Sequence, residues 1–279
     1  MSAEDVAVPM AVWRRCLANV GRALAVLVRP VRIDPKTPWL LPRRELAIAT
    51  VAALVIFVLG MVFIDGPAAR AVQQLPHWLH SFFDAITDYG KSGWFLWPLG
   101  ILFLVLAALP PIASPVQQRV LAAIMVRVGF LFTAIAIPGL FDTIIKRLIG
   151  RARPFVGGHL DPTLFHLLVW RPDYASLPSG HATNVFAVLV AFASLWPRTR
   201  TYFLIYALLI VFSRVVVTAH YPTDVLTGAL VGTVGALMVR RWFAMRRLGF
   251  SYGPDGVPHL YPGPSRRRIK AVARAVLAD

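Results

Sequence analysis

Three groups of polar residues between positions 146 and 224 have the side chains and the spacing that phosphate chemistry needs. They are Lys146 with Arg153-Pro154, Pro178-Ser179-Gly180-His181, and Ser213-Arg214 with His220 and Asp224. Lysine contributes a compact positive charge, and arginine contributes a planar fork that matches two phosphate oxygens at once. Histidine can act as a nucleophile or as a proton donor near neutral pH. Together these residue types predict a phosphate-binding site that carries its own nucleophile.

The second and third groups each precede an apolar stretch, which indicates how their side chains could act. Ser179 and Gly180 are expected at the N-terminus of a helix, where free backbone N–H groups face an anion. A proline fits the first turn of the following helix, and this puts Asp224 within reach of His220. A carboxylate bonded to one ring nitrogen leaves the other nitrogen free to attack phosphorus. His181 has no carboxylate near it in the sequence and is the candidate proton donor for the leaving oxygen.

Each of these residues also has a structural interpretation. Lys146 could pair with Asp142 one helical turn earlier, and His220 could form a purely structural hydrogen bond with Asp224. A metal site made of His181, His220 and Asp224 is a further alternative, but the three cationic side chains around it would repel a metal ion. Because two histidines and three cations converge on the same ends of the apolar stretches, phosphate chemistry without a bound metal is favoured.

The composition is that of a membrane protein. Of the 279 residues, 57% are hydrophobic and 15% are charged, and the mean hydropathy is +0.65. A soluble domain is usually about 45–50% apolar and about 25% charged. The net charge of +16 does not indicate a nucleic-acid partner, because the basic residues flank the apolar stretches and share no face. The single cysteine excludes a disulfide framework and a cysteine-based zinc site.

Six apolar stretches are candidates to cross a bilayer core of about 30 Å as helices. They cover residues 46–64, 94–113, 121–145, 182–196, 201–219 and 223–242. The fourth is short and crosses comfortably only if Ser179–His181 belong to its first turn. An amphipathic helix is expected at 70–88, between the first two stretches. The sequence thus predicts an all-α polytopic membrane protein with six transmembrane helices and both termini on one side.

The distribution of lysine and arginine predicts the orientation in the membrane. Twenty of these residues lie in the N-terminal arm, the C-terminal tail and the two short loops on the same side, against seven in the opposite loops. Cytoplasmic loops carry the excess of positive charge. Both termini are therefore predicted to be cytoplasmic, and the 146–181 loop is predicted to face outward.

Three parts follow from this pattern. Residues 1–44 form a basic N-terminal arm, whose 10–30 segment is expected to lie as an amphipathic helix on anionic lipid. Residues 45–243 form the six-span core. Residues 244–279 form a basic cytoplasmic tail, and its 249–265 stretch is expected to be a loop.

The motifs K-x6-RP, PSGH and SR-x5-H-x3-D resemble the three signature motifs of the type 2 phosphatidic acid phosphatase superfamily. The sequence matches each motif without departure between Lys146 and Asp224. The six-span pattern extends the resemblance to residues 45–243, and the two tails lie outside it.

This resemblance implies a metal-independent phosphatase that needs no cofactor. At the matching positions, His220 would be the nucleophile and Asp224 would orient it, while His181 would protonate the leaving group and then activate water. The phosphoryl oxygens would be bound by the remaining motif residues, Lys146, Arg153, Ser179, Gly180 and Arg214. Preorganised cations and N–H groups stabilise the charge that develops during phosphoryl transfer.

The resemblance also implies a lipid substrate. An outward-facing site in a bacterial inner membrane would open to the periplasm and hydrolyse undecaprenyl diphosphate, phosphatidic acid, phosphatidylglycerol phosphate or a phosphate of lipid A. A lipid phosphotransferase of the same family would share every motif residue and is the alternative. A vanadium-dependent peroxidase is disfavoured because such relatives are long and soluble, and a transporter or scaffold because no catalytic position is missing. The motifs leave the particular lipid and the oligomeric state open.

Overall fold

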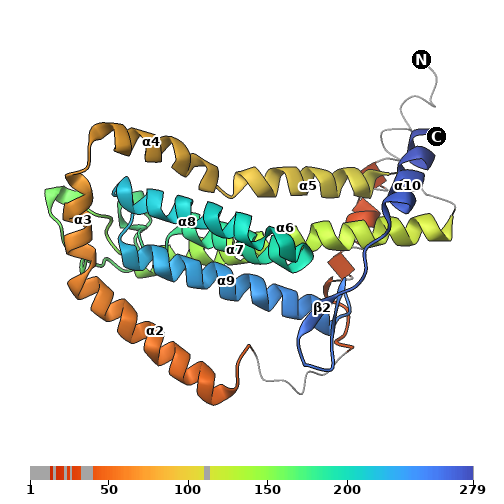
Figure 1. The fold of residues 1–279 in the computed structure, drawn as a ribbon, viewed down its shortest axis with the longest axis horizontal. Coiled ribbons are helices and arrows are strands. Elements are labelled where there is room, and N and C mark those ends of the chain that lie inside the picture. Colours follow the sequence, from red (N-terminus) through yellow and green to blue (C-terminus); the bar gives the residue numbers. More distant parts are fainter. Residues whose placement is uncertain are drawn as a thin grey trace. The chain divides into compact units, whose positions relative to one another are not determined.

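The structure is a computed structural model that describes residues 13–14, 17–21, 24–25, 27–32, 40–109 and 114–278, with side chains as far as residue 274. Helices dominate this part of the chain (Figure 1). The α-helices are α2 (Arg43–Phe63), α3 (Asp65–Gln73), α4 (His77–Thr87), α5 (Gly93–Ala108), α6 (Pro115–Ile149), α7 (Gly180–Leu195), α8 (Arg200–Val216), α9 (Pro222–Met245) and α10 (Arg266–Ala278). The shorter elements are the 3-10 helices η1 (Asp88–Gly90), η2 (Val156–Gly158), η3 (Pro172–Tyr174) and η4 (Pro197–Thr199), and the antiparallel strands β1 (Phe250–Tyr252) and β2 (Pro258–Leu260). The prediction of a helical protein is confirmed.

Five helical segments are long and apolar enough to cross a membrane, as an integral membrane protein requires. They are Arg43–Phe63, His77–Ala108, Pro115–Ile149, Pro197–Val216 and Pro222–Met245. The remaining expected span corresponds to α7, which is apolar but has 16 residues and therefore a length of about 24 Å. Ser179 is its N-cap, and Gly180 and His181 begin its first turn. The count of six spans and the cytoplasmic termini stay predictions.

Two expected elements differ from the structure. The stretch at 70–88 holds two helices, α3 and α4, because Pro76 lacks an N–H group and stands at the N-cap of α4. The stretch at 249–265 contains the β1–β2 hairpin, whose turn includes Asp255 and Gly256, the latter with a φ of 71°. An Asp-Gly pair between two short strands is a common hairpin turn.

The predicted arm helix at 10–30 is described only in part. Its described residues are helical as far as residue 27, and the others lie outside the described residues.

The chain divides into two compact units, and three of the four boundaries between them fall within α5, α6 and α9. Unit 1 comprises Met1–Pro35, Phe95–Phe132 and Arg240–Asp279, and unit 2 comprises Lys36–Trp94 and Thr133–Val239. Every residue predicted for the phosphate site belongs to unit 2. The division of the sequence into arm, core and tail stays a prediction.

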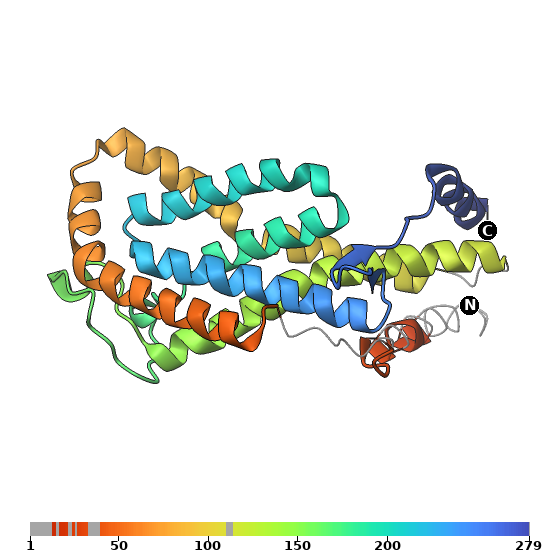
Figure 2. The same cartoon turned by 60° about the horizontal axis from the view of Figure 1, so that its bottom comes forward.

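In unit 2, α7 lies beside α8 and α9 (Figures 1 and 2). Val185 of α7 is fully buried and forms an apolar cluster with Ala207 and Ile210 of α8. Ala187 and Val188 are also fully buried. The apolar residues of this short helix are therefore covered by neighbouring protein.

Two glycines let α9 approach the backbone of α7 closely. Gly228 and Gly232 lie four residues apart on α9, so they share one face of the helix. A Cβ atom on Gly232 would overlap the carbonyl oxygen of Thr183, and one on Gly228 would lie 2.9 Å from the Cβ of Ala182. Small residues at this spacing allow helices to pack closely in membranes. This contact sets the position of the N-terminus of α9 against that of α7.

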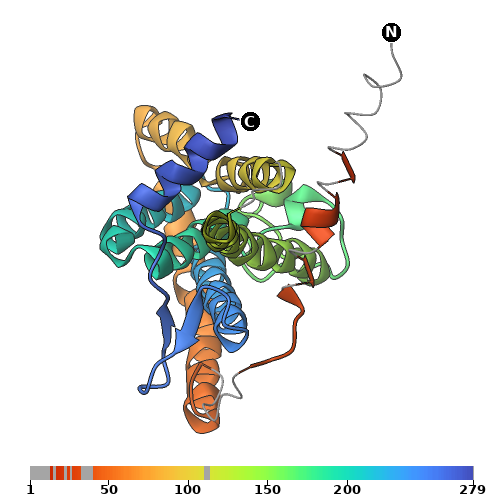
Figure 3. The same cartoon turned by 90° about the vertical axis from the view of Figure 1, so that its right-hand side faces the viewer.

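Unit 1 has its own aromatic contacts. Phe130 of α6 packs edge-on against Phe243 of α9 and Phe250 of β1, with ring centroids 5.4 and 4.8 Å apart. The hairpin is followed by α10, the last helix of the chain (Figure 3). Its Val272 is buried against Val120 of α6. The tail is thus a folded part of unit 1 through residue 272.

We predict that Gly232→Ala destabilises the protein by about 1–3 kcal/mol, because the added methyl group forces α9 away from α7. Gly100→Ala in α5 is the matched control, since its Cβ would meet the Phe132 ring at an ordinary 3.5 Å. Alanine alone favours a helix over glycine by about 0.5–1 kcal/mol, so the control should be neutral or slightly stabilised. Thermal unfolding in detergent measures both. A melting temperature for Gly232→Ala at or above that of the control would contradict the close packing.

Candidate active site

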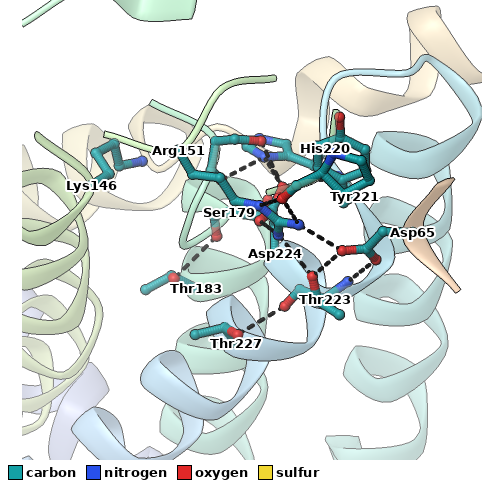
Figure 4. A network of polar contacts seen from close by, with 12 residues as sticks. Asp65, Lys146, Arg151, Ser179, Thr183, His220, Tyr221, Thr223, Asp224 and Thr227 are labelled. Carbon is teal, nitrogen blue, oxygen red and sulfur yellow. Dashed lines mark hydrogen bonds and ion pairs between the residues drawn. The ribbon is translucent and has the colours of Figure 1, made fainter. Parts of the chain in front are cut away.

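The three motifs come together at one set of helix ends in unit 2 (Figure 4). Lys146 and Arg214 lie in the last turns of α6 and α8, Ser179 is the N-cap of α7, and Asp224 lies in the first turn of α9. His220 is in the short turn between α8 and α9. The charges that act on its ring include those of all three predicted phosphate-binding cations. The predicted convergence is therefore present in the fold.

His220 is held by a backbone carbonyl. Its side chain is 3% exposed, and its Nδ1 lies 2.8 Å from the carbonyl oxygen of Ser176. A carbonyl oxygen can only accept, so Nδ1 carries the proton and Nε2 has the free lone pair. The prediction of a direct hydrogen bond between the His220 ring and Asp224 is wrong, because Asp224 Oδ2 is 3.9 Å from Nδ1. That separation exceeds hydrogen-bond distance, and the Ser176 carbonyl takes the place of the carboxylate.

Asp224 instead holds the residues on both sides of the ring. Its Oδ2 accepts hydrogen bonds from the Ser176 hydroxyl at 2.6 Å and from the Tyr221 backbone N–H at 2.9 Å. Ser176 supplies the carbonyl that binds the imidazole, and Tyr221 follows His220 in the chain. The Asp224 backbone carbonyl also accepts from the Ser179 N–H at 3.0 Å, which joins α9 to the start of α7. The carboxylate therefore fixes the His220 ring indirectly.

Several buried polar atoms of the motif residues have no partner. Within the part of the chain that the structure describes, these include the Ser179 hydroxyl, His181 Nε2, and the Nε atoms of Arg153 and Arg214. Ser179 occupies the expected N-cap position, but its side chain makes no capping hydrogen bond. An unsatisfied buried polar group costs about 1–3 kcal/mol. Three of the four atoms are N–H or O–H donors, so an anion with several oxygens would satisfy them together.

The two motif arginines are held in place from different elements. The Nη1 of Arg214 donates to the Thr87 hydroxyl of α4 at 2.8 Å. The backbone N–H of Arg153 donates to the Asp173 carbonyl at 2.8 Å. The loop before Arg153 turns at Gly150, which has a φ of 61° and lies so close to the His166 carbonyl that a Cβ would overlap it. Glycine is the residue that this backbone conformation favours.

Lys146 pairs with Asp142, as its structural interpretation predicted, and its ammonium also lies at the site. Its Nζ forms an ion pair with the Asp142 carboxylate at 2.5 Å, one turn earlier on α6. The same ammonium lies at the start of α7, because a Cβ on Gly180 would be 2.9 Å from Nζ. The pairing with Asp142 thus places the lysine charge beside the helix N-terminus. His181 packs there as well, with its ring against Gly90 of η1.

Burial and the charges around His220 both favour the neutral form of its ring. Burial is the largest cause, and together with Arg214, Arg153 and Lys146 it lowers the pKa of His220 well below the ordinary value of 6.5. A neutral imidazole is the form that can act as a nucleophile. Among the described residues no group of three or more His, Cys, Asp or Glu side chains could hold a metal ion.

Sequence reasoning missed four residues that build this site, Asp65, Arg151, Ser176 and Thr223. Arg151 is fully buried and pairs with both Asp224 and Asp65. A signal was present, because Asp65 is an isolated acid directly after an uncharged stretch and Arg151 lies inside the first motif. Buried charges need partners, so an acid and an arginine at helix ends are candidates to pair.

Comparison with known proteins decides the family. The model of the PAP2 superfamily matches residues 127–248. The lipid A 1-phosphatase of Rhizobium johnstonii is 32% identical over 204 residues, which are 72% of this chain and 82% of that protein. The chain belongs to the PAP2 superfamily. This confirms the resemblance to the type 2 phosphatidic acid phosphatases, and the matched region includes all three motifs.

Two further proteins are similar over smaller parts of the chain. The decaprenylphosphoryl-5-phosphoribose phosphatase of Mycolicibacterium smegmatis is 32% identical over 146 residues, 52% of this chain and 68% of that protein. The crystal structure of Aquifex aeolicus LpxE is 22% identical, with a TM-score of 0.45, and the match covers 62% of this chain and 92% of that one.

Proposed function

We propose that the protein is a metal-independent membrane phosphatase that hydrolyses a lipid phosphate through a phosphohistidine on His220. The observation that carries this proposal is the group of unpaired buried polar atoms of Ser179, His181, Arg153 and Arg214 in a site with a neutral histidine. A phosphoryl group has the oxygens that these donors lack. Phosphoryl transfer depends on such preorganised charge and positioning.

The proposed reaction has two steps, formation of the phosphohistidine and its hydrolysis. Nε2 of His220 attacks phosphorus, the bond from phosphorus to the lipid oxygen breaks, and His181 gives that oxygen its proton. A water molecule then attacks the phosphohistidine, His181 takes a proton from the water, and the N–P bond breaks to release inorganic phosphate. The same histidine is thus the acid of the first step and the base of the second. Lys146, Arg153, Arg214, Ser179 and Gly180 hold the phosphoryl oxygens.

The substrate we favour is the 1-phosphate of lipid A. The support is the identity of 32% to a lipid A 1-phosphatase of which the chain covers 82%. Undecaprenyl diphosphate, phosphatidic acid and phosphatidylglycerol phosphate are the competing substrates from the sequence. The motif residues are proposed to recognise the phosphoryl group, which these lipids share, so they do not distinguish the lipids.

The site opens, in this proposal, at the periplasmic face of a bacterial inner membrane. The charge distribution supports that orientation. The contacts at the site support six spans, because residues beside the ends of α2, α6 and α8 lie against residues beside the starts of α9, α7 and α5, respectively. Helices that cross in alternating directions bring these ends to one side. The short helix α7 would then be the fourth span.

We predict phosphate release from lipid A by the purified protein in excess EDTA, because no step needs a metal. The panel includes undecaprenyl diphosphate, phosphatidic acid and phosphatidylglycerol phosphate, and His220→Ala is the inactive control. Activity that disappears with EDTA and returns with magnesium would contradict the metal-independent mechanism. Release from a different lipid alone would correct the substrate. Transfer to an added lipid acceptor without hydrolysis would identify the phosphotransferase.

The pH profile of kcat/KM reports the ionisation of essential groups in the free enzyme. We predict that the acid limb of this profile lies below pH 6.5. Burial and the neighbouring cations lower the pKa of His220, so the neutral nucleophile persists below the pH at which an ordinary histidine is protonated. Rates are measured at constant ionic strength, with thermal unfolding at each pH to exclude loss of folded protein. An acid limb centred at or above pH 6.5 would contradict the neutral, buried state of this residue.

A further inference from the structure

A chain of buried ion pairs lies next to the contacts by which Asp224 holds the His220 ring. Arg151 Nη1 lies 2.5 Å from Asp224 Oδ1, and Arg151 Nη2 lies 2.7 Å from Asp65 Oδ2. All three side chains are fully buried. Asp65 begins α3, directly after the first apolar helix, and Asp224 lies in the first turn of α9. The arginine therefore joins two carboxylates from distant parts of the chain (Figure 4).

Arg151 differs from the phosphate-binding arginines because all its donors are used. Its Nε and Nη2 donate to the Pro162 carbonyl at 3.0 and 2.8 Å, and its Nη1 donates to the Thr223 hydroxyl at 2.8 Å as well as to Asp224. The guanidinium also lies over the Tyr221 ring, 4.6 Å from its centroid. Nothing of this group is left to bind a ligand. Its full set of partners fixes it in one place.

Asp65 also caps α9 from outside that helix. Its Oδ1 accepts from the Thr223 backbone N–H at 3.1 Å, and its Oδ2 accepts from the Thr223 hydroxyl at 2.5 Å. The first N–H groups of a helix have no partner within the helix, so a carboxylate there satisfies a donor and faces the positive end of the helix dipole. Close approach is possible because Gly60 of α2 has no side chain, and a Cβ there would lie 2.7 Å from the Thr223 methyl group.

We propose that Asp65 and Arg151 are positioning residues for the nucleophile. Asp65 and Arg151 hold the first turn of α9 and the Asp224 carboxylate. Asp224 holds Ser176 and Tyr221, and these hold the His220 ring with Nε2 toward the phosphoryl site. The inference rests on the proposed role of His220 as nucleophile. It gives the start of α3 a part in positioning the nucleophile, although no residue of that helix belongs to a motif.

The test compares kcat and KM for p-nitrophenyl phosphate, a phosphate ester whose use does not depend on the lipid. Asp65→Asn replaces one carboxylate oxygen by an amide NH2 group, which cannot accept from Arg151 or Thr223. We expect kcat per folded protein to fall about 10- to 100-fold, because small displacements of a reacting group have effects of this size. KM should stay within about twofold of the wild type, since the residues that bind the phosphoryl group are untouched.

Asp255→Asn, the same change at an exposed aspartate of the β1–β2 hairpin, is the control and should behave as the wild type. Equal kcat for folded Asp65→Asn and the wild type would overturn the inference, and so would a rise in KM at constant kcat. A wild type that releases no p-nitrophenolate would count against the proposed function, not against the role of Asp65.

A second pair of variants keeps the test decisive if Asp65→Asn does not fold. Thr223→Val removes only the hydroxyl between Arg151 and Asp65 and leaves the backbone contact with Asp65. The matched control is Thr227→Val, one turn further along α9, whose hydroxyl donates to the Thr223 carbonyl at 2.8 Å. We expect kcat to fall about 3- to 10-fold for Thr223→Val and to be unchanged for the control. Equal kcat values for the two variants would overturn the inference.

Discussion

The pairing of Arg151 with Asp65 and Asp224 is the interaction on which the geometry of the site depends. Charged groups taken out of water are stable only when their partners are close and their hydrogen bonds are satisfied. Asp224 meets this condition through Arg151, Ser176 and Tyr221, and each of these contacts also limits where the His220 ring can lie. The orientation of His220, the proposed nucleophile, therefore follows from the need to compensate a buried carboxylate.

The same constraint separates two kinds of arginine, even between Arg151 and Arg153, which are two positions apart. Arg151 is saturated by protein groups, whereas Arg153 and Arg214 each keep a buried Nε without a partner. A guanidinium whose donors are all bonded to protein groups stabilises the fold, whereas one with an unpaired N–H can bind an anion. The close contact of α9 with α7 at Gly232 then brings the proposed nucleophile close to the N-terminus of α7, where we propose that phosphate binds. Structural and chemical roles are thus divided among neighbouring residues of the same type.

Much of the fold and the motif positions could be predicted from the sequence, because apolar runs and helix-end residues are local signals. The apolar stretches became helices, and Ser179 stands at the N-cap of α7 as expected. The contacts of Arg151 with Asp65 and of Ser176 with Asp224 could not be predicted, since they join residues 86 and 48 positions apart. No spacing rule links such pairs. The same lack of a local signal explains the wrong expectation of a direct hydrogen bond between Asp224 and His220. Nothing near either residue in the sequence indicates that the Ser176 carbonyl binds the ring instead.

The most direct measurement is the position of the phosphoryl group in the trapped intermediate. Wild-type protein is mixed with substrate, quenched in alkali and digested, and mass spectrometry and NMR of the phosphopeptide locate the phosphorus. The account predicts one phosphoryl group on His220, bound to Nε2, because Nδ1 donates to the Ser176 carbonyl. A phosphoryl group on Nδ1, on His181 or on Ser179 would contradict it. Steady turnover with no phosphorylated histidine would contradict it as well.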